Sequence, residues 1–316
     1  MFIKLATRKL RAWRRITFCI CLVLLSSGFV VLQAQPLFVG GQILYSDGFE
    51  NYSQGPLDAN LSGSPNEAPN GGPGNPWFGP GTAANLQVYG AVNGVNPVSG
   101  GQMIGGRAPS DFDTDWLNMA YRFNGGNAFS GNLSLSWWFY DPAGAGSTTY
   151  MDYAGMGYSS IAPHNADYTP SSGGNLNTGS FGQMLALGAN YLAGGGFNPN
   201  DYQAQVLGAT NGINGGQWFN LPLTRTTGWH EAEIVLGAPQ GANTTVSFYI
   251  DNLSSPLLTE AIGTTSGLNV LEFNSAFGST SGFYDDLTLL QIPEPGSCAL
   301  LGLGWIGLLA FRGRSR

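Results

Sequence analysis

Apolar and polar residues alternate in short stretches along the middle of this chain. Residues 133–140 read Leu-Ser-Leu-Ser-Trp-Trp-Phe-Tyr, so one face would carry Leu133, Leu135, Trp137 and Phe139. Because successive side chains of a strand point to opposite faces, this period of two predicts a β-strand that buries one face. Residues 229–236 and 245–251 alternate in the same way, which turns inward His230, Ala232, Ile234, Leu236, Val246, Phe248 and Ile250.

Turn-forming residues separate these stretches, and no long amphipathic helical pattern lies between them. We expect residues 237–243 to form a hairpin loop, and residues 58–85 and 155–180, which are rich in Gly, Pro, Asn and Ser, to be irregular. Many short strands joined by such turns are typical of a β-sandwich or barrel. The pattern therefore predicts an all-β fold.

The charge of the chain is distributed unevenly. Of its 12 basic residues, nine lie before residue 35 or after residue 311, which leaves residues 35–292, called the body here, with Arg107, Arg122 and Arg225. Three basic against 18 acidic residues give the body a net charge of −15, compared with −7 for the whole chain. Such a body should not bind nucleic acid or anionic membrane surfaces, whereas calcium and neutral sugars suit it.

Cysteine and histidine are too few to support several kinds of site. Cys19, Cys21 and Cys298 all lie outside the body, which therefore has no disulfide, no cysteine nucleophile and no thiolate metal site. The histidines of the body are His164, in a Pro/Asn-rich loop, and His230, which alternates with apolar residues. Because serine catalysis needs a general base beside the nucleophile, and no Gly-x-Ser-x-Gly motif occurs, we do not expect it.

The N-terminus has the layout of a signal peptide. Six basic residues come before residue 16, and an apolar stretch follows over residues 16–32. Leu32-Gln33-Ala34 then places a small residue before the expected cleavage bond. We expect residues 1–34 to be a signal peptide and the body to be exported; an uncleaved signal anchor is the alternative.

The C-terminus combines a short motif, an apolar segment and a basic tail. Pro293, Glu294 and Pro295 precede an uncharged run over 298–311, and Arg312, Arg314 and Arg316 follow it. Residues 293–316 resemble the PEP-CTERM sorting signal of Gram-negative bacteria. The resemblance implies a transmembrane helix with the arginines on the cytoplasmic side, and processing by an exosortase, a membrane cysteine protease, during export to the cell surface. An ordinary C-terminal tail anchor is the alternative.

A second resemblance concerns the body. The segments 228–236 (Gly-Trp-His-Glu-Ala-Glu-Ile-Val-Leu) and 246–252 (Val-Ser-Phe-Tyr-Ile-Asp-Asn) resemble a hairpin of concanavalin A-like and laminin-G-like jelly rolls. Residues 47–52 and 282–287 also fit that pattern. The resemblance implies a jelly-roll β-sandwich over about residues 43–290, in which the first and last strands pair.

Two glutamates are the candidates for catalysis. Glu231 and Glu233 are two apart on a strand, so their carboxyl groups share a face and could approach the separation of about 5–5.5 Å that retaining glycoside hydrolysis needs. Related jelly-roll glucanases carry Glu-x-Asp-x-x-Glu, whereas this strand has Glu at the middle position and Leu236 at the last. Since the alternation also places both glutamates on a solvated face, we expect no catalysis.

We expect no cofactor, and the place where the first and last strands meet is the candidate for a structural calcium site. Asp47, Glu50, Asp285 and Asp286 would then lie close together, and a cation would offset their repulsion. In related carbohydrate-binding jelly rolls a structural calcium ion often lies there; capping of a turn by Asp285 and Asp286 is the alternative. Residues 111–115 (Asp-Phe-Asp-Thr-Asp) are not an EF-hand, because Trp116 replaces the required glycine and Arg122 the bidentate glutamate.

Exposed aromatic residues would provide stacking platforms for sugars. Trp138 and Tyr140 share one face of their strand, and three more lie beside turns, namely Trp77, Trp116 and Trp218. We expect an exported, surface-anchored, non-catalytic β-sandwich protein that associates with the extracellular polysaccharide matrix and binds glycans weakly. The alternatives are a jelly-roll glycoside hydrolase or lyase and a purely structural matrix protein without a ligand.

Overall fold

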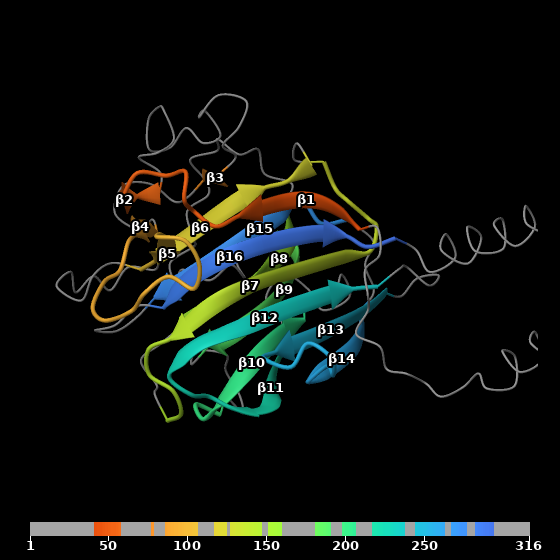
Figure 1. The fold of residues 1–316 in the computed structure, drawn as a ribbon. Helices are drawn as coiled ribbons and strands as arrows, with labels where there is room; N and C mark the ends of the chain where they lie inside the picture. The colour runs from red at the N-terminus through yellow and green to blue at the C-terminus, as the bar shows by residue number, and fades with distance from the viewer. Residues whose placement is uncertain are drawn as a thin grey trace, which may run out of the picture. The chain divides into compact units, whose positions relative to one another are not determined.

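The computed structural model describes residues 41–57, 77–78, 86–106, 117–124, 127–146, 151–159, 181–190, 198–206, 217–237, 244–262, 267–276 and 282–293. The elements in this part of the chain are β-strands, without a helix, and all of them belong to one compact unit. The expectation of an all-β fold is therefore confirmed (Figure 1).

The described strands form two sheets in which every pairing is antiparallel. The nine-stranded sheet has the order β14 (Leu258–Ile262), β13 (Thr244–Ile250), β12 (Gly228–Leu236), β7 (Leu133–Asp141), β16 (Phe283–Gln291), β5 (Met103–Gly105), β4 (Gln87–Tyr89) and β2 (Gly55–Pro56), with β1 (Gln42–Asp47) also pairing β16. The seven-stranded sheet has the order β11 (Gln217–Thr224), β10 (Asp201–Val206), β9 (Phe181–Asn190), β8 (Met151–Ser159), β15 (Val270–Ala276), β6 (Leu117–Arg122) and β3 (Trp77–Phe78).

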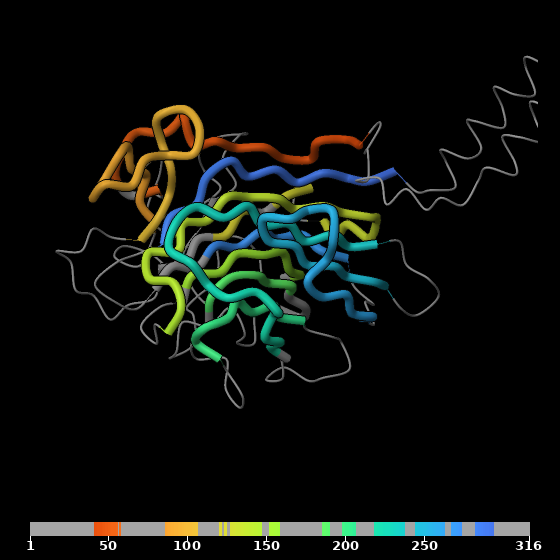
Figure 2. The backbone as a smooth tube through the Cα atoms, turned by 60° about the horizontal axis from the view of Figure 1, so that its bottom comes forward, coloured from red at the N-terminus to blue at the C-terminus, as the bar shows by residue number. Residues whose placement is uncertain are grey.

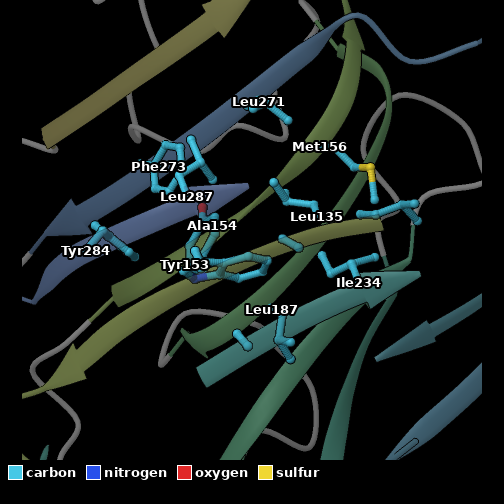
Figure 3. Packing of buried hydrophobic residues seen from close by; sticks show 14 of the residues in the cluster. Leu135, Tyr153, Ala154, Met156, Leu187, Ile234, Leu271, Phe273, Tyr284 and Leu287 are labelled. Carbon is cyan, nitrogen blue, oxygen red and sulfur yellow. The ribbon is translucent and has the colours of Figure 1, made fainter. Parts of the chain in front are cut away.

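The core lies between the two sheets. The inward positions that the alternation predicts on β7, β12 and β13 are all buried. Side chains of the two sheets meet there: the rings of Phe139 and Tyr202 lie 5.5 Å apart, and those of Phe273 and Tyr284 lie 5.1 Å apart. Figure 3 shows the same region, with Leu135 and Ile234 of one sheet facing Met156 and other residues of the second. Each fully buried large apolar side chain contributes about 1.5–3 kcal/mol, so this shared core holds the sheets together without disulfides.

The first and last strands of the body pair, as expected. Ser46 lies opposite Thr288 and Asp47 opposite Leu287, and Figure 2 shows β1 in red beside β16 in blue. The pairing of β16 with β7 slips between Asp285 and Thr288, where Asp286 has a φ of 48°. This bulge turns the backbone of β16 at the point where two acidic residues follow each other.

Two expectations about local structure have different outcomes. β12 and β13 form the expected hairpin. Residues 151–159 form the regular strand β8, so the expectation that the chain becomes irregular at residue 155 is wrong for its first five positions.

Several expected features lie outside the described residues. These are the signal peptide 1–34, Glu294 and Pro295 with the apolar run and basic tail that follow, residues 111–116 and His164. Within the described part of the chain, no helix has the length and apolar character needed to cross a membrane.

Candidate active site

Three acidic residues and a tryptophan gather on the outer side of the nine-stranded sheet. Glu231 on β12 and Asp285 on β16 both lie opposite Trp138 of β7, one on each side. Glu233 lies opposite Ser136 on the same face. Residues that pair across antiparallel strands point to one side, and the inward positions of β7 and β12 alternate with these. We call this set, Ser136, Trp138, Glu231, Glu233 and Asp285, the acidic face.

Glu233 is buried although it points away from the core. Its exposed fraction is 7%, and Ser134 Oγ donates a hydrogen bond to its Oε1 at 2.5 Å. Burial raises the pKa of Glu233, the hydrogen bond from Ser134 lowers it, and the nearby charge of Glu231 raises it, with a net upward shift. The expectation of a solvated glutamate is therefore wrong at this position. A carboxyl group in such a setting holds its proton to higher pH than an exposed one.

Glu231 is half-buried, and its backbone is held firmly. Asp251 N donates to Glu231 O at 2.8 Å, and Glu231 N donates to Asp251 Oδ1 at 3.2 Å. Partial burial raises the pKa of Glu231, and the negative charge of Asp251 adds to this effect. The two glutamates thus share a face but differ in burial, and such differences assign different protonation states to paired carboxyl groups.

The 96–102 loop lies between β4 and β5 (Figure 1) and contacts the acidic face at Asp285. Its backbone amides donate to two carboxylates: those of Val98 and Ser99 to Asp285 Oδ2, at 2.8 and 3.2 Å, and those of Gly101 and Gln102 to Glu50 Oε1, at 2.8 and 3.0 Å. Trp229 Nε1 donates to Asn96 O at 2.9 Å. Hydrogen bonds to charged groups contribute about 1.5–3 kcal/mol each, so the loop is fixed in place.

Asp285 accepts hydrogen bonds from this loop and is buried. Its exposed fraction is 0%, and its Oδ1 accepts a further hydrogen bond from Asp286 N at 2.8 Å. Burial raises the pKa of Asp285 to about 6, because the backbone donors offset only part of the desolvation. Asp285 therefore shapes the acidic face without being able to touch a substrate.

The expected calcium ligands all have protein partners. Asp47 Oδ2 accepts hydrogen bonds from the hydroxyls of Tyr45 and Tyr52, at 2.5 and 2.6 Å. Glu50 and Asp285 bind the loop amides, and Asp286 Oδ1 accepts from Ser99 Oγ at 2.6 Å. Among the residues that the structure describes, no three His, Cys, Asp or Glu side chains are grouped so that they could hold a metal ion. Calcium binding by these four residues stays a prediction from the sequence, and the acids here anchor loops.

The structure separates the expected sugar platforms. Trp138 is half-buried on the acidic face, between Glu231 and Asp285. Tyr140 packs against Trp229 and Phe283, with ring centres 5.5 and 6.2 Å away, in a small cluster that includes Val95 and Met103. Trp218 belongs to β11 of the other sheet and packs on Tyr153 at 5.2 Å. The side chain of Trp77 and the whole of Trp116 lie outside the described residues.

His230 points inward, away from the acidic face. Its Nδ1 lies 2.8 Å from Asp251 Oδ2, and its Nε2 lies 2.8 Å from the carbonyl oxygen of Thr226. The hydroxyl of Thr226 is farther from Nε2, at 3.3 Å. The ring nitrogens of His230 therefore contact Asp251 and Thr226, and not the carboxyl groups of Glu231 or Glu233.

Two buried polar features are not among the sites expected from the sequence. Arg225 pairs with Asp141, with Nε 2.9 Å from Oδ2, and both side chains are almost fully buried. On the outer side of the seven-stranded sheet, Glu272, Gln203 and Gln205 are also buried. A sequence signal exists for this second set, because Gln203 and Gln205 alternate with the apolar residues of β10. Nothing in the sequence links Arg225 to Asp141.

The sequence matches no protein-family model and no curated protein. Solved structures with a similar arrangement include the alginate lyase Aly36B, at 12% identity over 77% of this chain and 95% of that one, with a TM-score of 0.44. An endo-1,3-β-glucanase from Streptomyces sioyaensis matches at 15% identity over 79% and 96%, with a TM-score of 0.43. An endo-β-1,4-glucuronan lyase from the fungus Trichoderma reesei matches at 11% identity over 65% and 86%, with a TM-score of 0.39.

The expectation of a non-catalytic protein is corrected by the burial of Glu233. The sequence predicts no catalysis because the strand departs from Glu-x-Asp-x-x-Glu and because both glutamates would be solvated. The second reason fails, since Glu233 is buried with a raised pKa. The pair Glu231 and Glu233 is therefore the candidate active site.

Proposed function

We propose that this protein is a jelly-roll glycoside hydrolase whose acting pair is Glu231 and Glu233. The observation that carries the proposal is the placement of both carboxyl groups on one face of β12, with Glu233 buried and Glu231 more exposed. Alternate residues of a strand are about 6.6 Å apart at Cα, which lets their carboxyl groups reach the separation of about 5–5.5 Å used by retaining enzymes.

The difference in burial assigns the two roles. Glu233, with the more buried carboxyl group, keeps a proton and donates it to the glycosidic oxygen as the bond to the anomeric carbon breaks. Glu231, the more exposed, is ionised and attacks the anomeric carbon to form a glycosyl ester. Water then attacks that carbon, Glu233 accepts its proton, and Glu231 is released as a carboxylate.

Neighbouring side chains would position the sugar and the acid. Trp138 lies directly across from Glu231, and the C–H groups of a sugar ring can pack on its indole face. Ser134 holds the Glu233 carboxyl group in one orientation through its hydrogen bond, so it is a positioning residue. The 96–102 loop, fixed by Glu50 and Asp285, limits the site at one end.

The release of new reducing ends from polysaccharides tests this proposal. Purified protein should release them from at least one member of a panel of β-1,3-glucan, cellulose, agar and alginate. Glu231→Gln and Glu233→Gln should each lower kcat at least about 100-fold, in line with the loss of a general acid or base. Glu260→Gln, the same change on the edge strand β14, is the matched control and should keep full activity. A wild-type protein that releases nothing, or two variants that remain active, would exclude this site.

We also propose that the enzyme is exported and held at the cell surface through residues 293–316. The order of motif, apolar run and arginine tail supports this proposal, as does the basic and apolar N-terminal segment. An exosortase-type membrane protease would then be its processing partner, and the extracellular polysaccharide matrix would bring it into contact with substrate.

A further inference from the structure

We infer that the proposed active site takes a neutral polysaccharide, and that the sugar chain lies across the strands of the nine-stranded sheet. The inference rests on the proposed function and names the substrate class of the same site. Two independent observations carry it: the distribution of charge around the acidic face, and a row of hydroxyl-bearing side chains that crosses it.

Of the three arginines of the body, Arg107 lies outside the described residues, and the other two are not available to the acidic face. Arg225 is buried and forms an ion pair with Asp141. Its Nε lies 2.9 Å from Oδ2, and its Nη2 lies 3.0 Å from Oδ1. Arg122 belongs to β6 of the other sheet, where it lies opposite Val270. His230 points into the core. In the described part of the acidic face, the charged groups are therefore all carboxyl groups.

An anionic sugar chain would meet only repulsion on such a face. Each uronate carboxylate near the cleavage point would lie beside the ionised Glu231, and like charges at short range oppose binding. A lyase that removes the proton next to the uronate carboxylate also needs a cation or hydrogen-bond donors to stabilise the charge that develops there. The described acidic face holds hydroxyl groups but no cation for such a reaction.

A row of hydrogen-bonding side chains crosses five strands at the level of Glu233. The pairing registers place in one line Ser46 on β1, Thr288 on β16, Ser136 on β7, Glu233 on β12 and Tyr249 on β13. Adjacent strands are about 4.8 Å apart, so the row spans about 19 Å.

The hydroxyl groups of this row suit an uncharged sugar. Each both donates and accepts a hydrogen bond, which is also what the hydroxyls of a sugar do. Ser46 is exposed, and Thr288, Ser136 and Tyr249 are half-buried, so the row can be reached from solvent. Ser46 Oγ and Thr288 Oγ1 already lie 3.4 Å apart, which shows that neighbouring members are close enough to share one sugar unit.

The experiment compares polymers that differ only in charge. The protein is given β-1,3-glucan and β-1,4-glucan oligosaccharides, each beside its counterpart in which the C6 alcohol is oxidised to a carboxylate. Reducing ends report hydrolysis, and the ultraviolet absorbance of unsaturated ends reports lyase chemistry. We expect reducing ends from a neutral member, at least a tenfold lower rate on its oxidised counterpart, and no unsaturated ends.

Equal or faster cleavage of the oxidised member, or unsaturated ends, would overturn the inference while leaving a glycan-cleaving enzyme in place. Inactivity on every member would remove the proposed function and this inference with it. Thr288→Ala tests the direction of the sugar chain, since it should raise KM for the neutral oligosaccharide at least threefold and leave kcat unchanged. Thr245→Ala, on β13 but outside the row, is its matched control. An unchanged KM in Thr288→Ala would place the sugar elsewhere.

Discussion

Ser134 Oγ lies 2.5 Å from Glu233 Oε1, across the boundary between β7 and β12. This contact joins a small hydroxyl to a carboxyl group that the sheet buries, and it opposes the rise in the pKa of Glu233 that burial causes. Removing the hydroxyl should therefore change the titration of Glu233 more than it changes the fold.

In Ser134→Ala, the pKa of Glu233 should rise further, because a hydrogen bond that favours the carboxylate is lost. If Glu233 is the general acid, the alkaline limb of the profile of kcat/KM against pH should move to higher pH. Ser247→Ala, a similar change on β13, should leave the profile in place. A limb that stays in place in Ser134→Ala would mean that Glu233 does not control it.

Arg225→Met should destabilise the protein by about 3–5 kcal/mol, because it leaves the buried Asp141 carboxylate without its ion pair. Burial by itself would raise the pKa of Asp141, but Arg225 and the backbone amides of Ala143 and Gly144 together bring it below its ordinary value. The stabilisation that comes from this lowered pKa is present when the pH is above the ordinary pKa of Asp141 in the unfolded chain. It is lost as the pH falls through the lower pKa that Asp141 has in the folded protein. Denaturant unfolding of the single variant and of Arg225→Met/Asp141→Asn checks this, and the double variant should recover part of the loss.

Asp285 should make the fold less stable as the pH rises from about 4 to about 6. Burial raises its pKa from 3.8 to about 6, so the folded state binds a proton over this range that the unfolded state has released. The contribution of Asp285 to the free energy of unfolding is therefore complete below its ordinary pKa. It is lost as the pH rises through the pKa that Asp285 has in the folded protein, and the loss is up to about 3 kcal/mol. The free energy of unfolding of the wild type minus that of Asp285→Asn should fall across this window. A flat difference would show that Asp285 titrates normally.

Deletion of residues 293–316 should release the body into the medium, because the apolar run and arginine tail would no longer hold it in the membrane. Immunoblots of cells and medium measure this. Replacing the three terminal arginines with glutamines separates the tail from the motif. Cell retention of the truncated protein at the wild-type level would exclude the sorting signal.

The alternation of residues predicts which face of a strand a side chain occupies but not what covers that face. It places Glu231 and Glu233 together on β12 and turns His230 inward, and the structure agrees. The burial of Glu233 depends on its neighbours from β7 and β13, which the period of two does not reveal. Asp285 is covered by the 96–102 loop. That loop is far from it in the chain, since Val98 and Asp285 are 187 residues apart.

The failed expectation at residues 155–159 has a similar cause. A stretch rich in glycine predicts irregular chain, yet Gly155 lies inside β8. A Cβ atom there would lie 1.9 Å from the backbone oxygen of Leu185 on β9, so glycine allows two strands to approach closely. Sequence alone does not distinguish this use of glycine from a turn.

Covalent labelling by a mechanism-based inhibitor tests the central claim most directly. A 2-deoxy-2-fluoro glycoside with a good leaving group, built on the neutral sugar that the protein cleaves, should form a stable ester with the nucleophile of a retaining enzyme. Peptide mass spectrometry of the labelled protein should place the sugar on Glu231, and Glu231→Gln should remain unlabelled. A label on any other residue, or turnover of a neutral glycan without a label at Glu231, would contradict the assignment of Glu231 and Glu233 as the active site.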